Sequence, residues 1–380
     1  MSNLGLYVHI PFCRQKCLYC DFTSYPGAEH LFIAYTTALC QQIADQGGML
    51  CKPAVDTIYI GGGTPSLLPV HLIEQILSSI DDNFTIVSGA EISMEANPGT
   101  VNKDQLAALK IAGVNRLSFG VQSFNNSLLA RLGRIHQAAD ALVAVECAFN
   151  AGFNNISIDL MYGLPGQTPD GFAWELEQAV ALKINHISVY GLKLEEGTPL
   201  ATAYDQGFII LPDEAADEAM YDLMTEFLPL QGLGRYEISN FARPGSECRH
   251  NLKYWRYQPY LGLGTAAHSF LNGERSAAVS GIKEYIDALS SGSSPVVMRE
   301  KVSKAEAMAE YTFLALRTTY GLVFSDFARY FATDFCQHFR SILVSLQQQK
   351  LLDMNNERVW LTGRGMKFGN VVFSSFLPDG

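Results

Sequence analysis

The sequence has few positive charges, no long apolar run and no export signal. Lysine and arginine number 27 against 38 aspartate and glutamate residues, a formal net charge of −11. This balance argues against a nucleic-acid backbone as the main partner, because phosphate binding needs a basic face. No apolar stretch approaches the roughly 18 to 20 residues that span a bilayer, so we expect no transmembrane segment. No charged-then-apolar leader stands at the start, and we therefore expect a cytoplasmic protein.

Cysteines are also few, and only three of the eight lie close together in the sequence. Cys13, Cys17 and Cys20 are separated by three and then two residues, which lets their thiolates reach different irons of one cube-shaped cluster. The fourth iron of such a cluster would have no protein ligand. A disulfide is disfavoured, because the trio is odd in number and no export signal precedes it. Zinc stays open as an alternative, although no second ligand pair of matching spacing follows.

The first half of the sequence alternates short β-rich runs with helical patterns. Six runs are expected to form buried parallel strands, at 6–10, 56–61, 90–96, 116–121, 156–163 and 186–192. Five segments between them are expected to form helices, at 31–46, 70–80, 103–112, 137–151 and 170–182. Right-handed crossovers allow an open barrel or a flat doubly wound sheet. We predict an α/β fold with a partial (β/α)6 TIM-like barrel, because polar and glycine-rich motifs follow the carboxyl ends of the strands.

The second half of the sequence has a different pattern. A helix is expected at 213–229, followed by irregular structure with short strands and, at 261–269, a tight loop. The remaining expected elements are helices at 302–317, 324–332 and 335–349 and a hairpin at 351–362.

Two changes of composition, near positions 205 and 290, predict domain boundaries. They divide the chain into a half-barrel core at 1–205, a connecting region at 206–290 and a smaller, mostly helical C-terminal domain at 291–380.

Several polar residues follow the expected strands and are candidates for ligand binding. The GGGTP run at 61–65 allows a close approach of backbone amides to a ligand, or forms only a tight turn. Glu95 and Asp159 are carboxylates where the core should be apolar, so each has a structural partner or holds a polar ligand. Gln122 follows the fourth strand. Arg134 either pairs with a ligand carboxylate or is a surface charge.

An ordered set of motifs covers most of the chain: YVHIPFCRQKCLYC, GGGTP, EANPG, GVQSFN, LGRIH and IDLMYGLPGQ. The set resembles the radical S-adenosylmethionine superfamily, and within it the branch of anaerobic coproporphyrinogen oxidases and related haem chaperones. The resemblance implies a [4Fe–4S] cluster on Cys13, Cys17 and Cys20, with S-adenosylmethionine bound at the open iron. It also implies nine residues that contact S-adenosylmethionine: Tyr7, Tyr19, Gly62, Gly63, Thr64, Glu95, Gln122, Arg134 and Asp159.

One position in the cysteine loop separates the two groups of this branch. The oxidases have a CxxxCxxCxC pattern, whereas Phe22 occupies the position of the fourth cysteine here. They also carry an N-terminal extension ahead of the cysteine loop, whereas Cys13 lies near the start of this sequence. The resemblance is therefore stronger to the chaperone group.

The segment HNLKYW at 250–255 matches an HNxxYW pattern associated with haem binding in the chaperone group. By this resemblance His250 would ligate the haem iron, and Tyr254 and Trp255 would stack on the porphyrin. Cys248 and His268 are alternative ligands. Without the resemblance, a packed or hydrogen-bonded loop would be the ordinary interpretation of this segment.

The resemblance implies a haem chaperone that delivers haem to an apo-haemoprotein, with the cluster and S-adenosylmethionine gating or assisting the transfer. A flavodoxin- or ferredoxin-type electron donor is a further expected partner, and transient membrane association stays open. The alternative is a radical enzyme, an oxygen-independent coproporphyrinogen III oxidase that catalyses oxidative decarboxylation.

Overall fold

A computed structural model describes residues 3–378 of the chain. Its largest element is a mixed sheet whose central strands are all parallel: β11 (Tyr260–Leu263), β1 (Leu4–Ile10), β4 (Ala54–Gly62), β5 (Thr85–Ala96), β6 (Arg116–Gln122), β7 (Ile156–Tyr162) and β8 (His186–Gly191). Antiparallel strands extend both edges: β12 (His268–Leu271), β13 (Glu274–Ala278) and β14 (Val296–Lys301) beyond β11, and β10 (Asn240–Ala242) and β9 (Gly234–Arg235) beyond β8. The six predicted strands correspond to β1 and β4 to β8.

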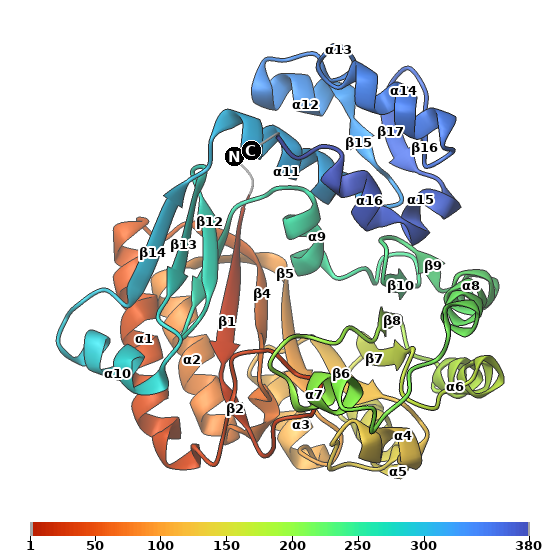
Figure 1. The fold of residues 1–380 in the computed structure, drawn as a ribbon. Coiled ribbons are helices and arrows are strands. Elements are labelled where there is room, and N and C mark those ends of the chain that lie inside the picture. The colour runs from red at the N-terminus through yellow and green to blue at the C-terminus, as the bar shows by residue number, and fades with distance from the viewer. Residues whose placement is uncertain (1–2, 379–380) are drawn as a thin grey trace.

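Helices of the βα repeat pack on the outer side of this sheet (Figure 1): α1 (Phe32–Met49), α2 (Val70–Asn83), α3 (Lys103–Ile111), α5 (Ala138–Asn150), α6 (Pro169–Ala181) and α8 (Glu214–Leu230). Their starts follow the local sequence. Asn102 and Gln105 form a capping box before α3, and Thr168 caps α6 ahead of a proline in the first turn. Shorter helices lie in the loops or at the sheet edge: η1 (Glu29–Leu31), η2 (Pro65–Leu67), α4 (Asn126–Arg131), α7 (Pro199–Asp205) and α10 (Ile282–Ser290). The predicted fold class is confirmed.

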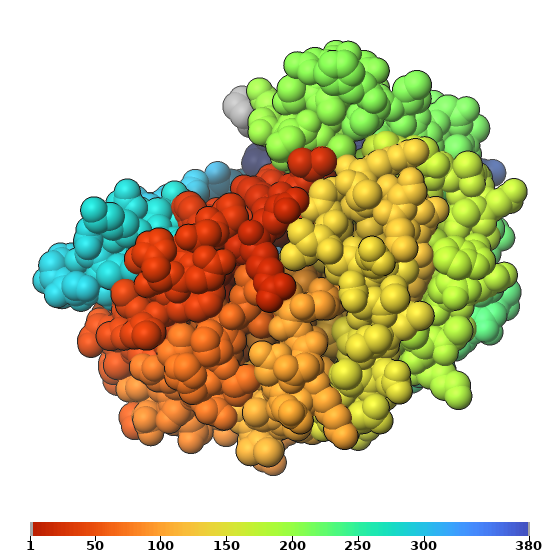
Figure 2. Space-filling model, turned by 90° about the horizontal axis from the view of Figure 1, so that it is seen from below, coloured from red at the N-terminus to blue at the C-terminus, as the bar shows by residue number. Residues whose placement is uncertain are grey.

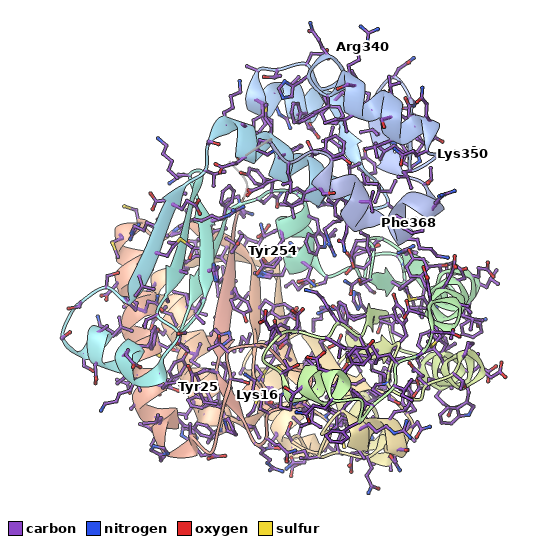
Figure 3. The ribbon with its side chains drawn as sticks, in the orientation of Figure 1. Lys16, Tyr25, Tyr254, Arg340, Lys350 and Phe368 are labelled. Carbon is purple, nitrogen blue, oxygen red and sulfur yellow. The ribbon has the colours of Figure 1, made fainter. Side chains whose placement is uncertain are left out.

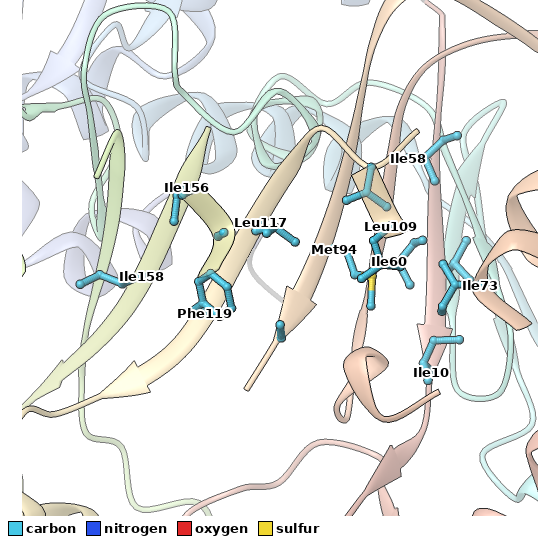
Figure 4. Close-up of a cluster of buried hydrophobic side chains, with 14 of the residues drawn as sticks. Ile10, Ile58, Ile60, Ile73, Met94, Leu109, Leu117, Phe119, Ile156 and Ile158 are labelled. Atoms are coloured by element: carbon cyan, nitrogen blue, oxygen red, sulfur yellow. The ribbon is translucent and has the colours of Figure 1, made fainter. Parts of the chain in front are cut away.

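The main core lies between the strands and these helices. Ile58 and Ile60 of β4 are fully buried there, together with Ile73 of α2 (Figure 4). Side chains alternate along a strand, so Thr57 and Tyr59 point to the opposite, inner side of the half-barrel. The sequence of β4 thus builds the core with one face and supplies polar groups to the interior with the other.

The chain after α8 returns to the half-barrel. Helix α9 (Arg249–Trp255) packs against the amino-terminal part of β4, and β11 then adds a seventh parallel strand beside β1. The tight loop predicted at 261–269 is wrong in part, because the segment holds β11, a turn and β12. Strands from both sides of position 205 share one sheet; the boundaries near 205 and 290 stay predictions.

A C-terminal unit, blue in Figure 1, has its own aromatic core, which includes Phe327, Phe335 and Phe339. Its helices are α11 (Lys304–Leu316), α12 (Phe324–Phe331), α13 (Phe335–His338), α14 (Arg340–Gln348), α15 (Gly363–Lys367) and α16 (Gly369–Ser374). A small sheet joins β15 (Leu322–Val323), β17 (Arg358–Leu361) and β16 (Leu352–Met354). The predicted hairpin is confirmed, whereas the helix predicted at 335–349 is divided at Phe339. No helix among residues 3–378 is long and apolar enough to cross a membrane.

Replacing Ile60 by alanine tests the core described above. Ile60 is fully buried, so Ile60→Ala should lower the free energy of unfolding by about 2–5 kcal/mol, because the lost contacts leave a cavity. Denaturant titration of the two proteins measures the difference. Ile111→Ala is the matched control, since Ile111 is 86% exposed and should change stability little. Equal losses in the two variants would contradict this core assignment.

Candidate functional site

The loops at the carboxyl ends of the parallel strands surround a cavity of about 430 Å³. Figure 2 looks onto this end and shows the N-terminal loop region, in red, beside the yellow segments that follow β6 and β7. The volume falls within the roughly 300–1,000 Å³ typical of small-molecule sites. The cavity is lined by all three cysteines of the N-terminal trio and by eight of the nine predicted S-adenosylmethionine contacts: Tyr19, Gly62, Gly63, Thr64, Glu95, Gln122, Arg134 and Asp159.

The cysteine trio is carried by a loop that is closed at its base. Cys13 ends β2 (Phe12–Cys13), which pairs with β3 (Tyr25–Pro26), and the Cys20 amide donates to the Cys17 carbonyl inside the loop. Burial raises the pKa of the Cys20 thiol. Within residues 3–378, no three cysteine, histidine or acidic side chains are close enough to bind a single metal ion. Three thiols on one cavity wall fit a cluster, whose irons are spread over several corners.

The glycine run after β4 allows this loop to pack closely against the barrel. A side chain at Gly63 would place its Cβ 2.6 Å from the Phe12 carbonyl oxygen and 3.0 Å from Cys13 Sγ. Gly62 has φ +115°, and a Cβ there would lie 2.7 Å from the His9 ring. The amides of Gly62, Gly63 and Thr64 all donate to protein acceptors. The glycine run at 61–65 therefore positions the cysteine loop, and the three amides are already hydrogen-bonded within the protein.

The two predicted carboxylates lie inside the half-barrel and keep part of their hydrogen-bonding capacity. Glu95 accepts from Tyr59 Oη (2.8 Å) and from the Gly62 amide (3.1 Å). Burial, opposed by these hydrogen bonds, raises the pKa of Glu95 to about 7. Asp159 accepts from Ser118 Oγ (3.3 Å), and burial also raises the pKa of Asp159. The direct hydrogen-bond donors to both carboxylates are neutral, and Arg116 lies near enough to lower both pKa values in part. Each carboxylate can still accept a hydrogen bond from a polar ligand.

Arg134 is half-buried and connects three loops. Its guanidinium donates to Cys17 Sγ (3.4 Å), Asn97 Oδ1 (2.7 Å) and the Gly120 carbonyl (2.5 Å). Asn97 in turn donates to Thr64 Oγ1 (2.9 Å). Of the two interpretations open for Arg134, surface charge is therefore excluded. Asn97 was not among the predicted site residues, although it lies in the EANPG motif that indicated this loop.

Tyr7 is the predicted contact that lies apart from the others. It lines a neighbouring cavity of about 560 Å³, which shares Gly62 and Glu95 with the first. Tyr7 Oη lies 3.0 Å from His9 Nδ1. Gln122 remains at the end of β6 with a left-handed backbone (φ 67°). The two cavities together form one interior that is open at the carboxyl ends of the strands.

The predicted haem ligand His250 lies at the other end of the half-barrel. It is fully buried, its Nδ1 lies 2.9 Å from Thr57 Oγ1, and its Nε2 lies 2.8 Å from Tyr254 Oη. Its ring also stacks on Tyr59 at 5.4 Å. Both nitrogens are engaged, so a haem iron could reach His250 only by breaking one of these hydrogen bonds.

The other two residues of the haem motif point in different directions. Tyr254 lines the interior cavity, whereas Trp255 lines a separate cleft against the C-terminal unit. In Figure 3, Tyr254 on α9 lies far from Lys16 of the cysteine loop. Of the alternative ligands, Cys248 is buried, with its pKa raised to about 12 by burial, and His268 is exposed beside the interior cavity. The structure does not bring the three motif residues to one surface, and haem ligation by His250 stays a prediction.

The half-barrel and its cysteine loop are those of a radical S-adenosylmethionine protein. Residues 7–178 match the family model of the radical SAM superfamily, and residues 302–368 match that of the HemN C-terminal domain. Proteins of this superfamily use a [4Fe–4S] cluster and S-adenosylmethionine.

Similarity to individual proteins identifies the family within this superfamily. The heme chaperone HemW of Bacillus subtilis is 37% identical over 98% of this chain and 99% of its own length, and that of Lactococcus lactis is 36% identical over 98% and 97%. The chain belongs to the HemW family. Among solved structures, coproporphyrinogen III oxidase (HemN) from Escherichia coli superposes with a TM-score of 0.87 at 25% identity, covering 98% of this chain and 90% of that one. The resemblance drawn from the motifs is confirmed.

Asp159→Ala tests the predicted S-adenosylmethionine contacts. Loss of a carboxyl acceptor that lines the cavity should weaken S-adenosylmethionine binding by about tenfold to a hundredfold. Calorimetric titration of the anaerobically reconstituted protein measures the affinity. Asp170→Ala, at an exposed position of α6, is the matched control. Equal affinity of Asp159→Ala and the wild type would refute the assignment.

The buried His250 should make stability depend on pH. Burial, with smaller contributions from Lys253 and Arg116, lowers the pKa of His250 to about 3. The unfolded imidazole takes up a proton near pH 6.5 and the folded one only near pH 3, so stability falls as the pH drops below 6.5, by about 2 kcal/mol from this residue at pH 5. Denaturation of His250→Gln between pH 7 and pH 5 should show a shallower fall than the wild type, whereas His30→Gln, at an exposed position, should not. An unchanged pH dependence in His250→Gln would show that the ring is not held neutral.

Proposed function

We propose that this protein is a haem chaperone, which binds haem and delivers it to an apo-haemoprotein. The observation that carries the proposal is the near full-length similarity to proteins named heme chaperone HemW. Phe22 supports it, because it occupies the position where the oxidase pattern has a fourth cysteine and is 64% exposed at the mouth of the cavities.

The residues of the first cavity fit a cluster with S-adenosylmethionine. Cys13, Cys17 and Cys20 would hold three irons, and the amine and carboxylate of S-adenosylmethionine would complete the fourth. When bound, this pair supplies a reducing electron and a source of a 5′-deoxyadenosyl radical. The chain itself would orient the ligand: Glu95 and Asp159 offer acceptors on the cavity lining, and Arg134 positions the cysteine loop through Cys17.

Delivery of haem requires partners that the chain would meet in turn. An apo-haemoprotein receives the haem, and a flavodoxin- or ferredoxin-type donor reduces the cluster. We place this exchange in the cytoplasm, with transient docking on a membrane surface where the recipient is membrane-bound.

A second function, oxygen-independent coproporphyrinogen III oxidation, is favoured by one observation. The E. coli HemN structure covers nearly the whole chain with a TM-score of 0.87. Shared architecture does not fix the reaction, because the same fold carries different chemistries. In this chain the oxidase pattern is interrupted at Phe22.

A transfer assay separates the two functions. Haem-loaded protein should pass its haem to an apo-cytochrome, and the absorbance spectrum of the holo-cytochrome should then appear. Its rate of appearance should exceed the rate at which the loaded protein loses haem spontaneously. The reduced, reconstituted protein should form no protoporphyrinogen from coproporphyrinogen beyond one turnover. Product accumulating over many turnovers without haem transfer would replace the chaperone proposal with the oxidase.

A further inference from the structure

A cleft of about 720 Å³ lies outside the half-barrel, between α9 with the loop after it and the C-terminal helices α11 and α12. It is separate from the cavities of the cluster end. Its lining includes Arg256 and five large aromatic side chains: Trp255, Tyr257, Tyr311, Tyr320 and Tyr330. Its volume is that of a site for a large organic ligand.

Helix α9 divides this cleft from the interior. His250 and Trp255 are five residues apart, so they project about 140° from each other around the helix axis. His250 faces Thr57 and Tyr59 inside the half-barrel, and Trp255 faces the cleft. One planar ligand cannot contact both residues in this arrangement.

The aromatic side chains form two groups around the cleft. The rings of Tyr257, Tyr311 and Tyr330 pack as a triangle with centroids 5.7 to 5.9 Å apart, and Tyr330 is 57% exposed. Trp255 stacks on the Arg317 guanidinium at 4.4 Å, and its indole Nε1 is buried without an acceptor among the described residues. Exposed and half-buried aromatic faces around one cleft are suited to a flat conjugated ligand.

The charged side chains that line the cleft are two arginines, Arg256 and Arg329, and two carboxylates, Glu247 and Asp326. Arg256 is exposed at its wall, and no carboxylate within residues 3–378 pairs with its guanidinium. Arg329 is already paired with Asp326 at 2.8 Å. A ligand carboxylate could therefore gain a charge-assisted contact with Arg256 without breaking an existing ion pair.

We propose that this cleft, and not the buried face of α9, holds the haem of the proposed chaperone; the inference rests on that proposed function. The porphyrin lies against Trp255 and Tyr330, and a propionate reaches Arg256. The described lining contains no imidazole, thiol or thioether, so a tyrosine hydroxyl is the iron ligand that it offers. His250 then has a positioning role: it holds α9 against the half-barrel.

This placement suits a protein that must give its ligand away. The cleft opens to solvent on the side of Tyr320 and Tyr330, both more than half exposed. Haem held by stacking and one oxygen ligand at an open cleft can leave without rearrangement of the half-barrel. A recipient can therefore approach it directly.

Haem titration of the full chain tests the cleft. Tyr330→Ala and Arg256→Ala should each weaken ferric haem binding by about tenfold or more, since each removes a direct contact. Tyr204→Ala and Arg340→Ala remove exposed residues elsewhere and should stay within about twofold of the wild type. His250→Gln, where circular dichroism shows it folded, should keep the wild-type haem spectrum, because the iron ligand is unchanged.

Each outcome of this titration has one meaning. Weaker binding in the two cleft variants alone supports the cleft. If both cleft variants bind and transfer haem as well as the wild type does, the cleft is not the haem site, and the chaperone proposal still stands. If folded His250→Gln loses the haem spectrum while the cleft variants bind haem normally, His250 is the haem ligand. A wild type that binds no haem overturns both proposals.

Discussion

Helix α9 is fixed against the amino ends of the half-barrel strands by buried polar contacts, and both candidate sites depend on its position. Glu91 of β5 accepts the backbone amides of Arg249 and His250, at 3.0 Å each, which caps the start of the helix. The nearly buried Lys253 forms an ion pair with Asp56 at 2.7 Å. Removing one partner of such a pair costs about 3–5 kcal/mol. The inner face of α9 closes the floor of the interior, and its outer face forms a wall of the cleft.

At the opposite end, a chain of contacts positions the cysteine loop. Thr64, Asn97 and Arg134 connect the loops after β4, β5 and β6, and the last of them reaches Cys17. Glycine at position 63 allows the loop to approach the barrel this closely. The three thiols that would hold a cluster line the same cavity. The parallel strands connect this end of the half-barrel, which carries the cysteine loop, to the end that carries α9.

The half-barrel could be predicted from the sequence, because buried parallel strands and amphipathic helices each have a characteristic pattern of hydrophobic residues within a short segment. It also indicated the carboxyl-end site, where motifs such as EANPG end successive strands. The role of α9 was not predictable in this way. His250 is held by Thr57, almost two hundred residues away, and such contacts leave no local pattern. For the same reason β11, a short strand of the sequence YLGL, was interpreted as part of a loop.

In the proposed arrangement, α9 separates a cofactor site on its inner side from a haem site on its outer side. Equilibrium dialysis of the reconstituted chain, with labelled S-adenosylmethionine bound and haem added stepwise, tests it most directly. We expect one haem to bind per chain while S-adenosylmethionine stays bound, because the two ligands would occupy opposite faces of the helix. Release of S-adenosylmethionine in proportion to the haem taken up would instead place haem in the interior, on the same side of α9 as the cofactor.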